Sequence, residues 1–196
     1  MGFAASISND EIEKLPFAAF DGEIIVVDST TGHSYAQAIE YLSAQDMLGF
    51  DTETKPCFVA KHPRNMLALL QLSGPDKTFL FRLPKTGIPQ ELAAILSDER
   101  ILKIGAAVDD DVAGLRKYNE FSGKGFVDLQ TVVADYGIEQ KSVKRMAAII
   151  LGVRISKSQQ LSNWESAVLS TAQQRYAAID AWICLKMWNK LSPVKK

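Results

Sequence analysis

The spacing of apolar residues changes along this chain, and that change limits the fold more than any other feature. Up to residue 104, short apolar runs of strand length alternate with two stretches of helical spacing, and Gly, Pro, Ser and Thr separate them. From residue 128 onward they recur every three or four positions and predict helix almost throughout. The pattern predicts an α/β fold: a mixed β-sheet flanked by helices, with a helical C-terminal third.

The predicted elements follow from these runs. Strands are expected over residues 23–28, 47–52, 66–72, 78–83 and 101–104, and helices over 35–44, 90–96, 108–118 and 171–191. The Gly and Pro at 74–75 indicate a hairpin between the third and fourth strands, and at least one crossover must lead into the fifth. With 196 residues, the chain is expected to hold one domain over residues 21–191, preceded by a lead-in at 1–20 and followed by a frayed tail at 192–196.

The amino-acid composition excludes few classes of function. A net charge of −1 neither indicates nor excludes nucleic-acid binding, because a carboxylate site lowers the net charge while its bound metal ions restore positive charge locally. Cys57 and Cys184 are too few for a disulfide framework and form no CxxC pair. A reducing, cytoplasmic location is therefore expected.

Acidic residues interrupt the apolar pattern at three places. In the predicted strand ending near residue 52, Asp51 and Glu53 share one face, since alternate residues of a strand point the same way. Two neighbouring carboxylates at the end of a buried strand repel each other unless a cation lies between them. The alternative is that the strand simply runs out into solvent at residue 51.

The second place is the run Asp109-Asp110-Asp111 at the start of a predicted helix. Such a run also suits a helix N-terminus, where negative charge complements the macrodipole. Asp111, however, lies three residues after Val108 and four before Leu115, on the apolar face. We therefore expect Asp111 alone of the three to point inward.

The third place is Asp180 in the last helix, next to an apolar stripe predicted through Leu169, Ala172, Tyr176, Ile179, Ile183 and Met187. Tyr176 lies four residues before Asp180, so their side chains are neighbours. A buried aspartate needs compensation, either from a metal or from a cation such as Arg175 or Lys186. If the three places converge, their hard oxygen ligands suit two Mg²⁺ or Mn²⁺ ions.

The motifs resemble those of the DEDD superfamily of 3′–5′ exonucleases, the group that includes RNase D and the exonuclease domain of the Werner-syndrome helicase. Phe50-Asp51-Thr52-Glu53 resembles the first motif, Lys103-Ile104-Gly105 with Asp111 the second, and Tyr176 to Asp180 the third. The family's alternative histidine would stand at position 175, where this chain has arginine, so the resemblance is to the tyrosine class.

The resemblance implies a ribonuclease H-like fold and hydrolysis of 3′-terminal phosphodiesters of DNA or RNA, with release of nucleoside 5′-monophosphates. It also implies that Asp51, Glu53, Asp111 and Asp180 ligate two divalent ions, while Tyr176 orients the attacking water. RNase D carries helical C-terminal domains that help to bind RNA, and no such segment follows in this sequence. Whether DNA or RNA is the substrate therefore stays open.

Substrate contacts are expected from Thr52 and from the basic loop at 55–64, where Phe58 would stack a base and Lys61 or Arg64 would hold phosphates. Lys157, with Lys144 and Arg154, forms a second predicted basic rim. An ordinary solvated loop is the alternative for 55–64.

Other functions remain open. One is a catalytically weak or inactive nucleic-acid-binding module of the same fold. Another is an endonuclease or transferase that uses the same acids, and a third is a small metal-dependent phosphatase.

Overall fold

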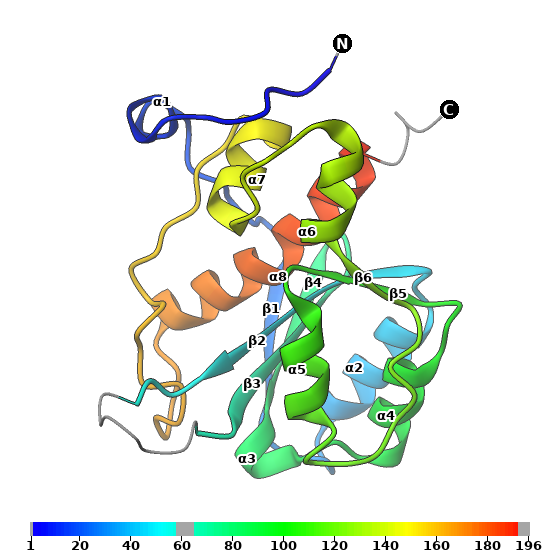
Figure 1. Cartoon of the computed structure of the whole chain (residues 1–196). Helices are drawn as coiled ribbons and strands as arrows, with labels where there is room; N and C mark the ends of the chain where they lie inside the picture. The colour runs from blue at the N-terminus through cyan, green and yellow to red at the C-terminus, as the bar shows by residue number, and fades with distance from the viewer. Residues whose placement is uncertain (1, 58–64, 192–196) are drawn as a thin grey trace.

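A computed structural model describes residues 2–57 and 65–191 as a single sheet with helices on both faces (Figure 1). The elements in chain order are α1 (Asn9–Glu13), β1 (Glu23–Val27), α2 (His33–Ser43), β2 (Met47–Thr54), β3 (Leu67–Ser73), β4 (Lys77–Arg82), α3 (Leu83–Thr86), α4 (Gln90–Ser97), β5 (Leu102–Gly105), α5 (Val108–Leu115), β6 (Phe126–Asp128), α6 (Leu129–Val132), the 3₁₀ helix η1 (Val133–Tyr136), α7 (Val143–Leu151) and α8 (Thr171–Leu191). The predicted mixed sheet flanked by helices is confirmed.

The sheet has the strand order β1-β4-β3-β2-β5-β6. β2, β3 and β4 form an antiparallel meander, whereas β1, β5 and β6 are parallel to their neighbours. The predicted hairpin and the crossover into β5 are both present. The sequence pattern missed β6, because three residues are too few to show a strand periodicity.

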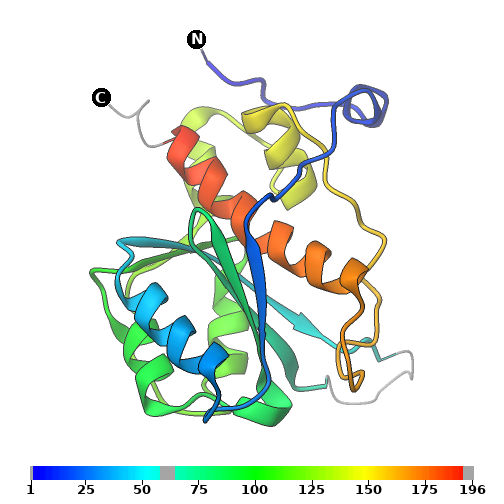
Figure 2. The same ribbon diagram turned by 180° about the vertical axis from the view of Figure 1, so that it is seen from behind.

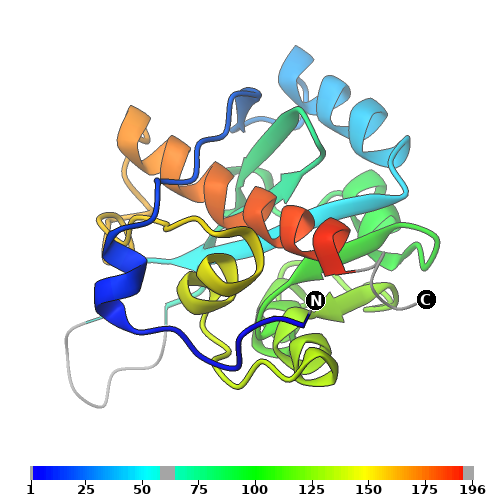
Figure 3. The ribbon, with the colours of Figure 1, turned by 90° about the horizontal axis from the view of Figure 1, so that it is seen from above.

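Two layers of helix cover the sheet. On one face, α2, α4 and α5 bury Leu42, Leu92 and Val112 in a common core. On the other face α8 runs across the strands, and its C-terminal half packs with α7 through Met146 and Met187 (Figures 2 and 3). Helix α8 therefore lies directly over β2, the strand that carries the first acidic motif.

Helix was expected almost throughout from residue 128 onward, and for residues 152–170 this prediction was wrong. The segment forms turns and one isolated bridge instead. Trp164 and Leu169 are buried against Leu69, Leu80 and Ala177, so their burial comes from the sheet and α8 rather than from a helix of their own.

The N-terminal segment packs along α7 and the strand-like start of this turn region (Figure 3). Arg145 donates hydrogen bonds to the Ile7 carbonyl and to Asn9, and Arg154 pairs with Phe17 in a parallel bridge. Ile12 on α1 is fully buried. Among the described residues, no helix combines the length and apolar character needed to cross a membrane.

Gly49 sets the distance between α8 and β2. A Cβ atom at this position would overlap the carbonyl oxygen of Ala181 and stand 2.7 Å from its carbonyl carbon. The strand and the helix backbone therefore touch, and this contact fixes where the neighbouring Asp180 lies relative to Asp51.

We expect Gly49→Ala to lower the free energy of unfolding by about 3 kcal/mol, because the added methyl group must displace helix backbone. Chemical denaturation monitored by circular dichroism measures this value. Gly32→Ala is the matched control: its nearest neighbour is 3.9 Å from the new methyl group, so it should change stability by less than about 1 kcal/mol. Equal effects of the two substitutions would contradict the close packing of α8 on β2.

Candidate active site

The end of β2 distributes its side chains over both faces of the sheet. Phe50 points to the α2–α4–α5 side, where it meets Phe126 edge-on at 5.0 Å between ring centroids. Asp51 and Glu53 face the opposite side, where α8 passes. The strand was predicted to end at residue 52 but continues to Thr54, so both acids stand on the strand, just before a register shift between Glu53 and Thr54, rather than in a solvent-exposed loop.

Asp51, Glu53 and Asp180 converge from β2 and α8. One carboxylate oxygen from each lies within 4.8 Å of the others, and all three residues are partly buried. That spacing allows a single divalent cation to contact all three carboxylates. The sequence placed these acids on two separate elements, and packing across Gly49 brings them together.

Asp111 lies beside this cluster rather than within it. Its carboxylate accepts a hydrogen bond of 2.5 Å from the Thr52 hydroxyl. Asp109 and Asp110 are exposed while Asp111 is partly buried, which confirms that Asp111 points inward. Asp111 is near enough for its charge to raise the pKa values of Asp51 and Glu53.

Tyr176 lies one turn before Asp180 on α8, as predicted. Its phenol lies close enough to the Asp180 carboxylate to lower the pKa of that group, and its ring contacts buried Trp164 at 6.0 Å between centroids. The predicted stripe was partly wrong: Ala172 is exposed, and the buried residues include Ala177, Ala178 and Ala181. Small residues are needed here because α8 lies so close to the sheet.

The carboxylates destabilise one another's charged forms. Burial, followed by the charges of Asp180 and Asp111, raises the pKa of Glu53 to about 8. Burial also raises the pKa of Asp180 to about 7 and that of Asp111 to about 6, and it raises the pKa of Asp51 well above its usual range. The cluster therefore holds protons near neutral pH until a cation replaces them.

The cations proposed as structural partners for Asp180 lie elsewhere. Arg175 is exposed, and the Lys186 ammonium lies 5.5 Å from the centre of the Trp182 ring. The cation that does lower the pKa of Asp180 is Lys157. A single exposed lysine does not balance three neighbouring carboxylates, so the donor set fits a divalent metal ion.

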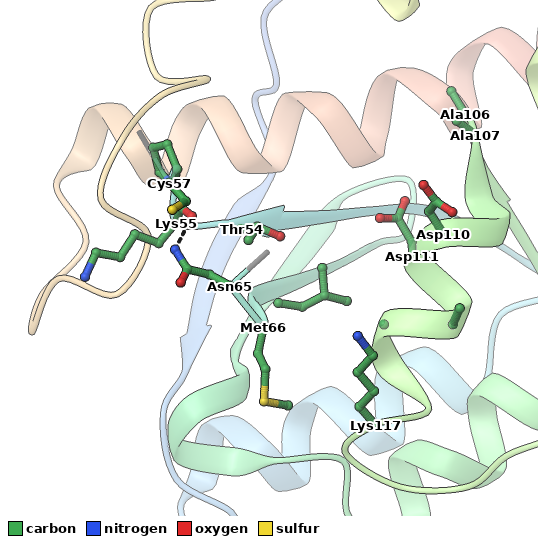
Figure 4. A pocket seen from close by; sticks show the side chains of 14 residues that line it. Thr54, Lys55, Cys57, Asn65, Met66, Ala106, Ala107, Asp110, Asp111 and Lys117 are labelled. Atoms are coloured by element: carbon green, nitrogen blue, oxygen red, sulfur yellow. Dashed lines mark hydrogen bonds between the residues drawn. The ribbon is translucent and has the colours of Figure 1, made fainter. Parts of the chain in front are cut away.

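Two cavities meet at this site. The smaller, about 300 Å³, contains Asp51, Glu53, Tyr176 and Asp180, and its opposite wall comes from the residues after α6, namely Ser142, Val143, Lys144, Ile155, Ser156, Lys157 and Gln160. The larger, about 640 Å³, lies between the β2–β3 end and α5, with Lys55, Asn65 and Lys117 around it (Figure 4). The Thr52–Asp111 hydrogen bond joins the linings of the two.

The predicted substrate contacts divide into three groups. Thr52, Lys157 and Lys144 line the smaller cavity. Arg154 does not: its guanidinium stacks on Phe17, 3.9 Å from the ring centre. Phe58, Lys61 and Arg64 lie outside the described residues, as does the predicted tail at 192–196.

Asp128, which supports the helix that carries Asp111, was not among the site residues predicted from the sequence. Ala107, just before α5, has a left-handed backbone with φ of 58°, and its N–H donates to Asp128 at 3.0 Å. The same Asp128 oxygen caps α6 through the Gln130 N–H. Asp128 therefore fixes the start of α5, and its position just before a helical apolar run was the available signal.

The mixed sheet carries carboxylates at the end of its central strand, facing a long C-terminal helix, and this arrangement suits metal-dependent phosphodiester hydrolysis. The sequence matches the family described as 3′–5′ exonuclease over residues 26–195. The chain belongs to this family and is a DEDD-type 3′–5′ exonuclease domain.

Curated relatives agree with this placement. The mouse bifunctional 3′–5′ exonuclease/ATP-dependent helicase WRN is 30% identical over 91% of this chain and 13% of its own length. The fruit-fly (Drosophila melanogaster) exonuclease 3′–5′ domain-containing protein 2 is 29% identical over 85% of this chain and 29% of its own length. The chain thus spans less than a third of either relative.

Solved structures show the same fold. The Nibbler EXO domain of Aedes aegypti superposes with a TM-score of 0.76 at 22% identity, over 91% of this chain and 94% of that one. Escherichia coli RNase D superposes with a TM-score of 0.75 at 24% identity, over 87% of this chain and 44% of that one. The ribonuclease H-like fold expected from the motifs is confirmed.

Proposed function

We propose that this chain is an active, metal-dependent 3′–5′ exonuclease that removes nucleoside 5′-monophosphates from the 3′ ends of DNA or RNA strands. The observation that carries the proposal is the convergence of Asp51, Glu53 and Asp180 within 4.8 Å at the wall of a cavity. Family membership gives the type of reaction, and the geometry supplies carboxylates able to perform it.

Each residue has a proposed role. Asp51, Glu53 and Asp180 would hold the divalent ions, with Asp111 completing the set from α5. When bound, two Mg²⁺ or Mn²⁺ ions supply the positive charge that activates a water and stabilises the leaving 3′-oxygen. Thr52 holds the Asp111 carboxylate in place, and Lys157, on the opposite wall, would attract the phosphodiester.

Tyr176 is proposed to position the attacking water rather than to remove its proton. Burial and the neighbouring carboxylates raise the pKa of this phenol, so it stays protonated at neutral pH. A protonated phenol donates one hydrogen bond and can accept another. It is therefore suited to holding a water next to Asp180.

We expect Tyr176→Phe to lower the turnover number by about 10-fold to 100-fold, with the Mn²⁺ affinity nearly unchanged, because only a positioning hydrogen bond is lost. Single-turnover cleavage of a labelled strand measures the rate. Tyr136→Phe is the matched control, since its hydroxyl bonds the Leu191 carbonyl away from the site. If Tyr176→Phe retained full turnover, the proposed role of Tyr176 in positioning the water would be wrong.

Cleavage of 5′-labelled single-stranded DNA and RNA, with Mg²⁺, Mn²⁺ or EDTA, tests the proposal. An exonuclease gives a ladder that shortens from the 3′ end, requires the metal and leaves circular strands intact. Cut circles would indicate an endonuclease. Binding without cleavage under every metal would favour the alternative, a catalytically inactive nucleic-acid-binding module.

The same experiment ranks DNA against RNA. Lys55 and Lys117 flank the larger cavity, and we propose that the strand leading to the scissile bond passes there (Figure 4).

We further propose a cytoplasmic location, on the evidence of the two widely separated cysteines.

A further inference from the structure

Gln71 is a polar side chain in an apolar setting. It lies in the middle of β3, has no exposed surface, and neither its amide nitrogen nor its amide oxygen has a hydrogen-bond partner among the described residues. A buried amide without partners costs stability, and an apolar side chain of similar size would avoid that cost. Its presence therefore calls for a partner that appears in another state of the site.

The strand register identifies the side chains that lie directly opposite Gln71. Gln71 stands directly opposite Asp51 across the β2–β3 pair, and directly opposite Leu80 across the β3–β4 pair. Opposed residues in an antiparallel pair project from the same face with Cβ atoms about 4.5–5.5 Å apart. Leu80 offers no polar atom, and Ser73 on the same face of β3 already bonds Thr78. Of the two side chains directly opposite Gln71, only that of Asp51 carries a hydrogen-bond acceptor.

A metal-bound carboxylate needs such a donor. When one oxygen of Asp51 binds a cation, its orientation depends on what holds the remaining lone pairs, and ligating carboxylates are commonly hydrogen-bonded by outer residues. A neutral amide suits this task better than a lysine or an arginine, because it adds no positive charge to compete with the metal.

We propose that Gln71 is a positioning residue that donates an amide hydrogen bond to Asp51 when the site holds its divalent cation. The inference rests on the proposed function, since it requires that Asp51 ligate a metal. In this arrangement β3 carries none of the acidic motifs, but it orients the carboxylate of Asp51 in the first motif.

The test measures Mn²⁺ binding alone, by isothermal titration calorimetry, on wild type and Gln71→Met. We expect the Mn²⁺ dissociation constant to rise about 10-fold to 100-fold, while the metal-free variant is at least as stable as wild type. Leu80→Met, on the other flank of Gln71, is the matched control and should leave Mn²⁺ affinity unchanged. Unchanged affinity in a folded Gln71→Met would overturn the inference and leave the proposed function standing.

A second measurement does not depend on the variant folding. In ¹⁵N-labelled wild type, Mg²⁺ should shift the Gln71 side-chain amide resonances, and Asp51→Asn should abolish that shift. If the protein binds Mg²⁺ but the Gln71 side-chain resonances do not shift, the inference is wrong and the proposed function still stands. A wild type that binds neither Mn²⁺ nor Mg²⁺ would overturn both the inference and the proposed function.

Discussion

Asp51→Asn is expected to lower the cleavage rate by about 10³-fold or more and, at the same time, to stabilise the metal-free protein. The loss of rate follows because removing one ligand forfeits metal-derived stabilisation of several kcal/mol, and each 1.36 kcal/mol corresponds to a factor of ten. The gain in stability follows because an amide ends the repulsion that raises the pKa values of Asp51 and its neighbours.

Two measurements on one variant test this expectation. The free energy of unfolding at pH 8 in EDTA should rise by about 1–3 kcal/mol, and turnover in Mn²⁺ should nearly vanish. Asp46→Asn is the matched control, because Asp46 is exposed just before the same strand and should affect neither quantity. A variant that is less stable than wild type without metal would show that the carboxylate cluster is a structural network rather than a strained metal site.

The second large effect is a pH-dependent stabilisation by metal. At saturating Mn²⁺, about 100 times the dissociation constant, we expect the melting temperature to rise by about 5–10 °C at pH 8, and by much less at pH 5.5. Protons and the cation compete for the same oxygens, so the affinity strengthens as Asp111, Asp180 and Glu53 lose protons between about pH 6 and 8.

The metal-free protein should show the opposite trend. The folded-state pKa values of Glu53 and Asp180 lie at about 8 and about 7, above their usual values of 4.5 and 3.8. Between about pH 4 and 8 the folded state therefore binds more protons than the unfolded state, and stability falls as pH rises through that window.

Differential scanning fluorimetry across pH 5–9, with EDTA or Mn²⁺, measures both trends. In the metal-free protein Asp51→Asn should flatten the pH dependence, whereas Asp46→Asn should keep it. A metal-induced shift of equal size at pH 5.5 and pH 8 would mean that the ion binds outside this cluster.

Much of the site was determined by the sequence itself. The strand period put Asp51 and Glu53 on one face, and the helix period separated Asp111 from Asp109 and Asp110; burial confirms both. The same local rules placed Tyr176 one turn from Asp180. These features depend on spacing along one element, which the order of residues fixes directly.

Only the tertiary structure decided how these elements meet. The contact of Gly49 with Ala181, the hydrogen bond from Thr52 to Asp111 and the register that sets Gln71 beside Asp51 join residues far apart in the chain. No periodicity records such contacts, because they depend on the distance and register between separate elements. For the same reason, residues 152–170 look helical in sequence but form turns. Trp164 in this segment is buried by packing against the sheet and α8, and not by neighbours on a helix of its own.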